Sequence, residues 1–355
     1  NEEFYEQYGI GENEAFPSWL SVGDRRLLQV PASVLQANAI VAKDGSGQYK
    51  TIADAVKAAP SKSSQRYIIY VKAGLYSENV TVSRKKTNLM FVGDGMGKTI
   101  VAAGRNVNDG STTFRSATFE VNPLVNAAAS GKGFIARDMS FTNIAGPAKH
   151  QAVALRVGAD YSAVFRCNFI GYQDTLYVHS LRQFFRECNI YGTVDFIFGN
   201  AAVVLQNCNI FVRKPMPNQK NTVTAQNRKD PNQNTGISIH NCKVVAARDL
   251  IPVKNAFPTY LGRPWKLYSR TVFMQTFLDD LINPAGWLEW SGDFALKTLY
   301  YGEYRNTGPG ASLDGRVKWP GFRVIKTADE ASQFTVGTFI SGSAWLPSTG
   351  ISFAG

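Results

Sequence analysis

The chain has 355 residues, of which 44% are hydrophobic, and a formal net charge of +11. It contains no run of about 18 apolar residues, which argues against a transmembrane helix, and no secretory leader is recognisable, so that a secreted form would already have lost one. The basic charge favours an anionic partner; charge alone does not choose among polysaccharide, nucleic acid and membrane surface, but the longest Lys/Arg run is only Arg84–Lys86.

The first 36 residues differ from the remainder. Residues 1–30 hold six acidic and two basic side chains, a net charge of −4, which leaves +15 on residues 31–355. Arg25-Arg26-Leu27-Leu28 contains a dibasic pair that could be a protease site, although two solvated arginines are the simpler alternative. We interpret residues 1–36 as a linker or propeptide remnant and residues 37–355 as one repeat-rich domain.

A short helix is expected at the start of this domain. Thr51–Pro60 places Ile52, Ala55, Val56 and Ala59 on one face, as in an amphipathic helix that would cap an open end. The glycines of Gly93–Thr99 do not have phosphate-loop spacing, so we expect a turn between coils. Strands are expected at Tyr67–Val71, Asn79–Val82, Asn88–Val92, Ala117–Val121 and Phe134–Phe141.

Four central segments repeat one pattern, in which alternating apolar residues lead to a Cys and a short apolar pair. The cysteines are spaced by 21, 20 and 34 residues, and the longest interval contains a polar loop over 214–234. Strand-like units with a period near 20 residues are typical of a solenoid, here a parallel β-helix in an all-β fold. The segments are Tyr161–Ile170, Arg182–Tyr191, Ala202–Phe211 and Gly236–Val245.

The four cysteines allow three disulfide connectivities. Chain order favours Cys167–Cys188 and Cys208–Cys242, which would indicate an oxidising compartment. The alternative is a buried stack of free thiols. The sequon Asn79-Val80-Thr81 makes Asn79 a glycosylation candidate and agrees weakly with secretion.

Two aspartates of the central coils are surrounded by apolar and aromatic neighbours. Asp174 and Asp195 are 21 residues apart, so in a solenoid of this period they should fall on neighbouring coils, about 4.8 Å apart. Such a pair suggests a site in which the two acids have different protonation states. The alternative is two ordinary loop aspartates.

Further along, the string Tyr260–Trp265 contains Arg263 and Trp265 beside a Gly and a Pro, which favour a rigid local backbone. A rigid Arg beside an aromatic ring suits a carboxylate, although a surface Arg stacked on Trp is the simpler reading. Gly286–Trp290 adds aromatic residues, Asp329–Phe334 suggests a helix, and Ser348–Gly355 suggests a frayed tail.

Five strings of this chain, in this order, resemble plant pectin methylesterases, and the similarity runs from about Asn38 to the C-terminus. The strings are Gly74–Glu78, Gln151–Arg156, Tyr172–Leu176, Asp195–Gly199 and Leu261–Trp265. The head is similar too, since plant members often carry an inhibitor-like pro-domain before an Arg-Arg-Leu-Leu site. The resemblance implies a right-handed parallel β-helix and hydrolysis of galacturonate methyl esters in homogalacturonan at the cell wall.

By motif position, the resemblance implies that Asp195 is the nucleophile and Asp174 the general acid/base. Gln151 and Gln173 would donate to the oxyanion, and Arg263 would orient Asp195. The substrate-binding set would be Gln151, Arg263, Trp265, Phe196 and, more weakly, Trp287. No metal or cofactor is expected, since His150, His179 and His240 lack metal-ligand spacing. A Ser-His-Asp hydrolase is not expected either, because no Gly-x-Ser-x-Gly elbow occurs.

These residue types suit ester hydrolysis. A cation beside Asp195 would keep it ionised, whereas an apolar surround and the neighbouring charge would raise the pKa of Asp174 and let it protonate methoxide. The resemblance further implies a secreted, monomeric enzyme that binds pectin and accepts a proteinaceous inhibitor, without nucleic acid or membrane. The alternatives are a β-helix lyase or glycosidase, or a silent wall-binding protein or precursor.

Overall fold

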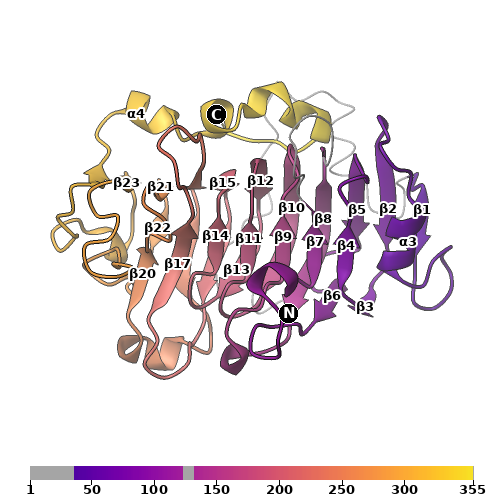
Figure 1. Cartoon of the computed structure of the whole chain (residues 1–355), viewed down its shortest axis with the longest axis horizontal. Coiled ribbons are helices and arrows are strands. Elements are labelled where there is room, and N and C mark those ends of the chain that lie inside the picture. The colour runs from indigo at the N-terminus through magenta and orange to yellow at the C-terminus, as the bar shows by residue number, and fades with distance from the viewer. Residues whose placement is uncertain (1–35, 123–131, 355) are drawn as a thin grey trace.

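The computed structural model describes residues 36–122 and 132–354. Parallel strands wind into a solenoid along the long axis of the molecule (Figure 1), so the predicted parallel β-helix is confirmed. The interpretation of 1–36 as a linker, with its Arg-Arg-Leu-Leu site, lies outside the described residues apart from residue 36. Among the residues described, no helix has the length and apolar character needed to cross a membrane.

Each coil contributes strands to three faces, two of which join into one 17-stranded sheet. The first face of this sheet holds β1 (Ala39–Val41), β2 (Tyr67–Val71), β5 (Leu89–Gly93), β12 (Arg182–Arg186), β15 (Ala202–Gln206), β18 (Gly236–His240), β21 (Arg270–Met274), β23 (Tyr300–Tyr304) and β24 (Phe322–Val324). The second holds β3 (Gly74–Ser77), β6 (Thr99–Ala103), β13 (Asn189–Gly192), β16 (Asn209–Val212), β19 (Lys243–Ala246) and β22 (Phe277–Leu278).

Two longer strands, β8 (Ile135–Asn143) and β10 (Ser162–Ile170), run through both faces and bend where they cross. The bend is a single residue with positive φ, Asp138 in β8 and Arg166 in β10. The same left-handed conformation recurs in the coils that follow, because one such residue turns the chain sharply without a loop. The recurring residues are Glu187, Asn207, Asn241, Gln275 and Arg305.

The third face is a separate seven-stranded parallel sheet. It holds β4 (Val80–Val82), β7 (Phe119–Val121), β9 (Leu155–Val157), β11 (Leu176–Val178), β14 (Ile197–Gly199), β17 (Asn221–Gln226) and β20 (Thr259–Gly262). Their order in the sheet follows their order in the chain, as a solenoid requires.

The predicted register of the four repeats is confirmed. Arg182 pairs with Ala202 and Ala202 pairs with Gly236, so the predicted segments begin on one row. Two expectations nearby were incomplete. Strands β3 and β6 were missed, since glycine-rich flanks hide their alternation, and the Gly93–Thr99 turn joins β5 to β6 within one coil rather than linking two coils.

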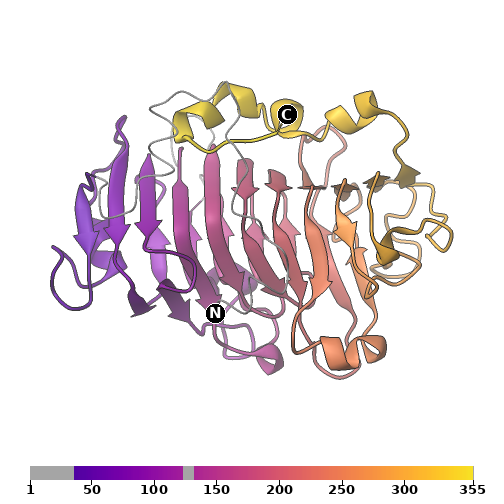
Figure 2. The same cartoon turned by 180° about the vertical axis from the view of Figure 1, so that it is seen from behind.

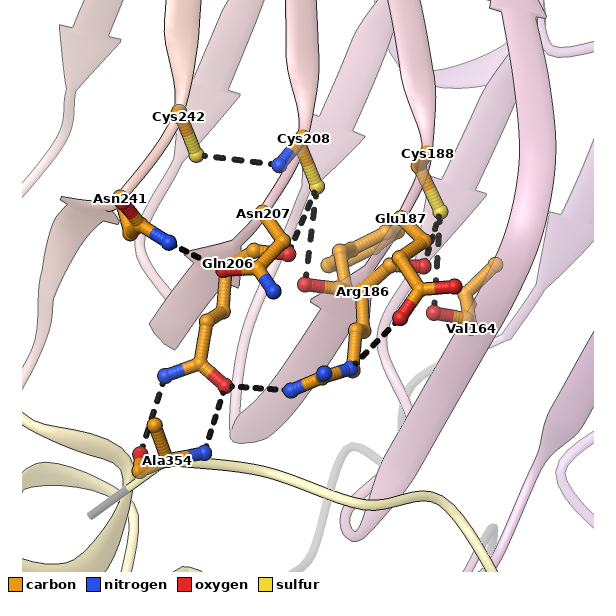
Figure 3. Close-up of polar contacts among 11 residues, drawn as sticks. Val164, Arg186, Glu187, Cys188, Gln206, Asn207, Cys208, Asn241, Cys242 and Ala354 are labelled. Atoms are coloured by element: carbon orange, nitrogen blue, oxygen red, sulfur yellow. Dashed lines mark hydrogen bonds and ion pairs between the residues drawn. The ribbon is translucent and has the colours of Figure 1, made fainter. Parts of the chain in front are cut away.

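The predicted disulfides are not present, because all four cysteines are buried free thiols. Figure 3 shows Cys188, Cys208 and Cys242 side by side on successive coils. Each thiol instead donates to the carbonyl two residues before it, at 3.3–3.4 Å. The carbonyl acceptors belong to Phe165, Arg186, Gln206 and His240.

The predicted helical cap is confirmed as α3 (Ile52–Ala58), at the N-terminal end of the solenoid (Figure 1). Ile52, Ala55 and Val56 are buried in the main core with the first strands. The helix start is held by the Thr51 hydroxyl, which accepts from the Asp54 N–H, and by the Glu78 carboxylate, which accepts from the backbone N–H groups of the first two helical residues at 2.9 Å.

The C-terminal segment covers the outer side of the 17-stranded sheet. It contains α4 (Ala328–Ser332), near the predicted helix, then α5 (Val336–Phe339) and two 3₁₀ turns, and Figure 2 shows it along one side of the coils. Phe334, Phe339, Trp345 and Phe353 pack there in a second apolar core. The tail was predicted to fray, but the Gln206 amide exchanges two 2.9 Å hydrogen bonds with the Ala354 backbone (Figure 3).

Candidate active site

Asp174 and Asp195 lie on adjacent rungs of the seven-stranded sheet. Leu176 of β11 pairs with Ile197 of β14, and each aspartate stands two residues before its strand position. Both side chains are largely buried, with 8% and 7% exposed. The structure thus brings the two acids together, one rung apart, which is about 4.8 Å between backbones.

Both aspartates adopt a left-handed backbone conformation, with φ of 63° and 51°. This conformation is uncommon for residues other than glycine and interrupts the in–out alternation of a strand. As a result, Phe196 and Ile197 both face the interior core, while Phe198 packs on the outer side. Phe196 was predicted to bind substrate, but it is fully buried and cannot contact one; that assignment is wrong.

Three donors hold the Asp195 carboxylate. Arg263, 68 residues later, donates from Nε to Oδ1 at 2.8 Å and from Nη2 to Oδ2 at 2.7 Å. The Thr222 hydroxyl donates to Oδ1 at 2.6 Å. Arg263 follows the end of β20, where its N–H donates to Thr224 of β17 at 3.0 Å. A carboxylate with a bidentate Arg and a hydroxyl donor is strongly stabilised in its charged form.

Asp174 has a different environment. Burial raises its pKa well above the usual value, the neighbouring Asp195 charge raises it further, and Arg263 only partly opposes them. Its neighbour on the other side, by register, is the buried Val153, which offers no donor. One acid of the pair is therefore arranged to be ionised and the other to hold a proton.

Gln151 and Gln173 lie on consecutive rungs next to the aspartates, since the Ala152 N–H donates to the Gln173 carbonyl at 3.2 Å. Both side chains are half-buried. Neither amide N–H donates to another group in the described part of the chain, and the Gln173 Oε1 is buried without a partner there. The amide N–H groups of Gln151 and Gln173 thus lie next to the acid pair and have no hydrogen-bond acceptor among the described residues.

Aromatic rings form a row on the same outer side. Tyr177 stacks on Phe198 with 4.3 Å between ring centroids, and Phe198 meets Trp265 edge-on at 6.0 Å. Phe114 extends the row, 6.5 Å from Tyr177. Tyr177 and Phe198 are only 8% and 2% exposed, so the rings of this row that a sugar could meet are the half-buried Trp265 and Phe114, which is 38% exposed.

Trp287 does not belong to this row. It is 1% exposed, stacks on Tyr301 at 4.0 Å and donates from its indole N–H to Glu303 at 3.1 Å. Its predicted contact with substrate is therefore wrong, because the ring lies inside the solenoid. Trp290, three residues on and 37% exposed, is the tryptophan at the site, with the Arg263 guanidinium 4.5 Å from its ring centroid.

Behind Arg263 lies a buried ion pair. Arg316 donates to Glu303 at 2.8 and 3.2 Å, and both side chains are 2% exposed. Glu303 in turn anchors Trp287, whose segment pairs with the end of β20 through Leu261 and Gly262. This network fixes the backbone from which Arg263 projects.

The histidines take no part in the acid pair. His150 is exposed, His179 has its pKa lowered to about 4 by burial and by Arg156, and the buried His240 bonds to Gln206 and Gln275. Across residues 36–122 and 132–354 no cluster of three potential metal ligands occurs.

Comparison with known proteins identifies the family that carries this site. The pectinesterase family model matches residues 38–343. The chain belongs to the pectinesterase family. It is 64% identical over 346 residues to the probable pectinesterase/pectinesterase inhibitor 61 of Arabidopsis thaliana, covering 97% of this chain and 58% of that protein. It is 62% identical over 340 residues to pectinesterase 2 of Citrus sinensis, covering 96% and 64%.

Among solved structures, the pectin methylesterase from carrot is 59% identical, with a TM-score of 0.86 over 90% of this chain and 98% of that one. The chain spans less than two thirds of the length of the two curated pectinesterases. The family match therefore covers the strands of the β-helix from β1 to β24.

Sequence reasoning missed three features of this pectinesterase site: Thr222, Trp290 and the ring pair of Tyr177 and Phe198. Thr222 follows a loop of irregular length, so its register with Asp195 could not be counted. Tyr177 and Phe198 stand three residues after the two aspartates, and that equal spacing was the available signal.

Proposed function

We propose that the chain hydrolyses the methyl esters of galacturonate in homogalacturonan, releasing methanol and leaving pectate. The observation that carries this proposal is the acid pair: Asp195 bound by Arg263 and Thr222, beside Asp174 with a raised pKa. Ester hydrolysis through a carboxylate nucleophile needs that carboxylate ionised and a separate proton donor for the leaving group within one site.

In the proposed mechanism, Asp195 attacks the ester carbonyl carbon and the carbonyl electron pair moves to oxygen. Gln151 and Gln173 donate to this oxyanion, and removing one such donor typically costs about 3 kcal/mol in the barrier. The intermediate collapses to an acyl-enzyme as methoxide takes the Asp174 proton. Water then attacks the acyl carbon, returns a proton to Asp174 and frees Asp195.

Substrate binding is proposed for the aromatic row with Gln151 and Arg263. Trp265 would pack against a sugar face, supported from behind by the buried ring pair of Tyr177 and Phe198. Pectate becomes a polyanion as the reaction proceeds, and the excess of +15 on residues 31–355 would retain it.

Compartment and partners are also proposed. The family acts on a wall polysaccharide, which suits a secreted monomer in the cell wall, without nucleic acid, membrane or cofactor. A relative is named pectinesterase/pectinesterase inhibitor. This name supports the proposal of a proteinaceous inhibitor as partner, and the proposal that residues 1–36 are a linker to an inhibitor-like domain. Asn79 stays a glycosylation candidate; its side-chain amide donates to the Ala117 carbonyl at 3.1 Å.

The test is methanol release from methylated pectin by the native chain, Asp195→Asn and Asp174→Asn. We expect at least a hundredfold loss in each variant, since each removes a group that the chemistry needs. Asp138→Asn is the matched control, because Asp138 also has positive φ and a bidentate Arg, Arg166, but sits in the other sheet. Near-native turnover in Asp195→Asn contradicts the proposal.

The product distinguishes the alternative enzymes. A lyase or glycosidase on the same fold would shorten the polymer and create unsaturated or reducing ends. The proposed esterase releases methanol and protons at constant chain length, which viscosity and reducing-end assays measure on the same samples.

A further inference from the structure

Thr222 is a buried residue of β17 that touches the nucleophile twice. Thr224 pairs with Ile197, so Thr222 stands on the rung beside Asp195. Its oxygen accepts from the Asp195 backbone N–H at 2.8 Å, and its hydroxyl donates to Asp195 Oδ1 at 2.6 Å. The side chain is fully buried.

The direction of the second bond follows from proton counting. A threonine hydroxyl has one proton, and an ionised carboxylate has none to give. The hydroxyl proton must therefore point at Oδ1, while the lone pairs receive the backbone N–H. Among the described residues, Oδ1 consequently accepts two donors, Thr222 and Arg263 Nε, whereas Oδ2 accepts Arg263 Nη2 alone.

We propose that Thr222 is a positioning residue that occupies Oδ1 and leaves Oδ2 as the attacking oxygen of Asp195. This inference rests on the proposed function and specifies how its nucleophile is aimed. Oδ2 forms the new bond to the acyl carbon, and Oδ1 becomes the carbonyl oxygen of the acyl-enzyme, still bound by Thr222 and Arg263. When water attacks, the bond from the acyl carbon to Oδ2 breaks and its electron pair returns to Asp195.

Thr222 also distinguishes the two acids. By register the row runs Val153, Asp174, Asp195, Thr222, so each acid has one acid neighbour and one other neighbour. For Asp174 the other neighbour is apolar, and for Asp195 it is a hydroxyl donor. This donor helps decide which acid stays ionised, and its contact with the Asp195 N–H holds the residue at φ 51°.

The experiment compares methanol release in Thr222→Val, which removes the hydroxyl at nearly constant shape, with Thr222→Ser, which keeps it. We expect kcat to fall about 10- to 100-fold in Thr222→Val with little change in KM, as for the loss of a hydrogen bond to a charged group. Thr222→Ser should restore kcat.

Thr224→Val is the matched control. Thr224 lies on the same strand, is equally buried, and donates to the Leu261 carbonyl at 2.9 Å rather than to Asp195. Its loss should leave kcat and KM near the wild-type values. Thr222→Ala provides a second variant without the hydroxyl if Val disturbs folding, which circular dichroism and thermal melting check.

The outcomes separate the two proposals. If the wild-type chain releases methanol but Thr222→Val and Thr222→Ala keep the wild-type kcat, the role of Thr222 is overturned and the esterase proposal stands. The same holds if Thr222→Ser fails to restore kcat, or if Thr224→Val lowers kcat equally. A wild-type chain that releases no methanol overturns both.

Discussion

At the scale of residues, two identical side chains acquire different chemistry from their neighbours. Asp174 lies between an apolar residue and a negative charge, and Asp195 lies among Arg263 and Thr222. The environment of Asp174 lowers the free energy of unfolding at neutral pH. Its carboxyl ionises freely in the unfolded chain, whereas the folded chain opposes that ionisation. Function and stability thus oppose each other at Asp174.

We expect Asp174→Asn to stabilise the fold at neutral pH. The pKa of Asp174 is raised in the folded chain. The contribution of the protonated carboxyl to the free energy of unfolding is therefore complete below the ordinary Asp pKa, and it is lost as pH rises through the pKa of the folded state. Asparagine does not titrate. Urea unfolding should therefore give the variant a higher midpoint at pH 7, with the gap narrowing as pH falls towards about 4 and closed below it. A constant gap across pH would contradict this explanation.

At the scale of elements, the string Gly74–Glu78 has a structural explanation. Tyr76 is buried and donates from its hydroxyl to the Lys72 carbonyl at 2.9 Å, which fixes the turn before β3. Glu78 then caps the start of α3. These residues close the end of the solenoid and lie on coils well before the acid pair.

Replacing Glu78 with Ala should destabilise the chain by about 1 kcal/mol, the usual cost of a lost helix cap. Ser77→Ala, at the exposed neighbouring position, should change stability by less than about 0.5 kcal/mol. Chemical denaturation measures both. Methanol release by folded Glu78→Ala should match that of wild type. A large loss of turnover would instead mean that α3 helps to hold the candidate site in place.

At the scale of the whole molecule, the solenoid separates its tasks by face. The interior holds the main core, the outer side of the 17-stranded sheet is covered by the C-terminal segment, and the seven-stranded sheet carries the acid pair and the aromatic row. The positive charge is a net charge of the whole domain. It therefore attracts a long anionic polymer, and acts much less on a single uncharged sugar unit of the substrate.

Salt should therefore shorten the runs of successive demethylation along pectin. Raising ionic strength from about 0.1 M to 1 M reduces the screening length from about 10 Å to 3 Å, which weakens retention of the newly formed polyanion. The lengths of demethylated blocks should fall, while turnover of short, fully methylated oligomers changes little. Block lengths independent of salt would remove the electrostatic explanation.

The sequence by itself determined the coil period, the register and the adjacency of the acids. These follow from local rules, since cysteines 20 or 21 residues apart must stack when each coil adds one strand to each face. The helical cap over 52–58 was likewise readable from apolar spacing and a threonine before it.

Only the tertiary structure decided which side chains face the substrate. The left-handed backbone at Asp174 and Asp195 reverses the alternation that follows, which turns Phe196 inward and Phe198 outward. Thr222 and Trp290 reach the site across loops whose lengths no period governs, and Trp287 is drawn inside by the buried Glu303. Backbone reversals and long-range pairings depend on the assembled coils, so the pattern along the chain could not reveal them.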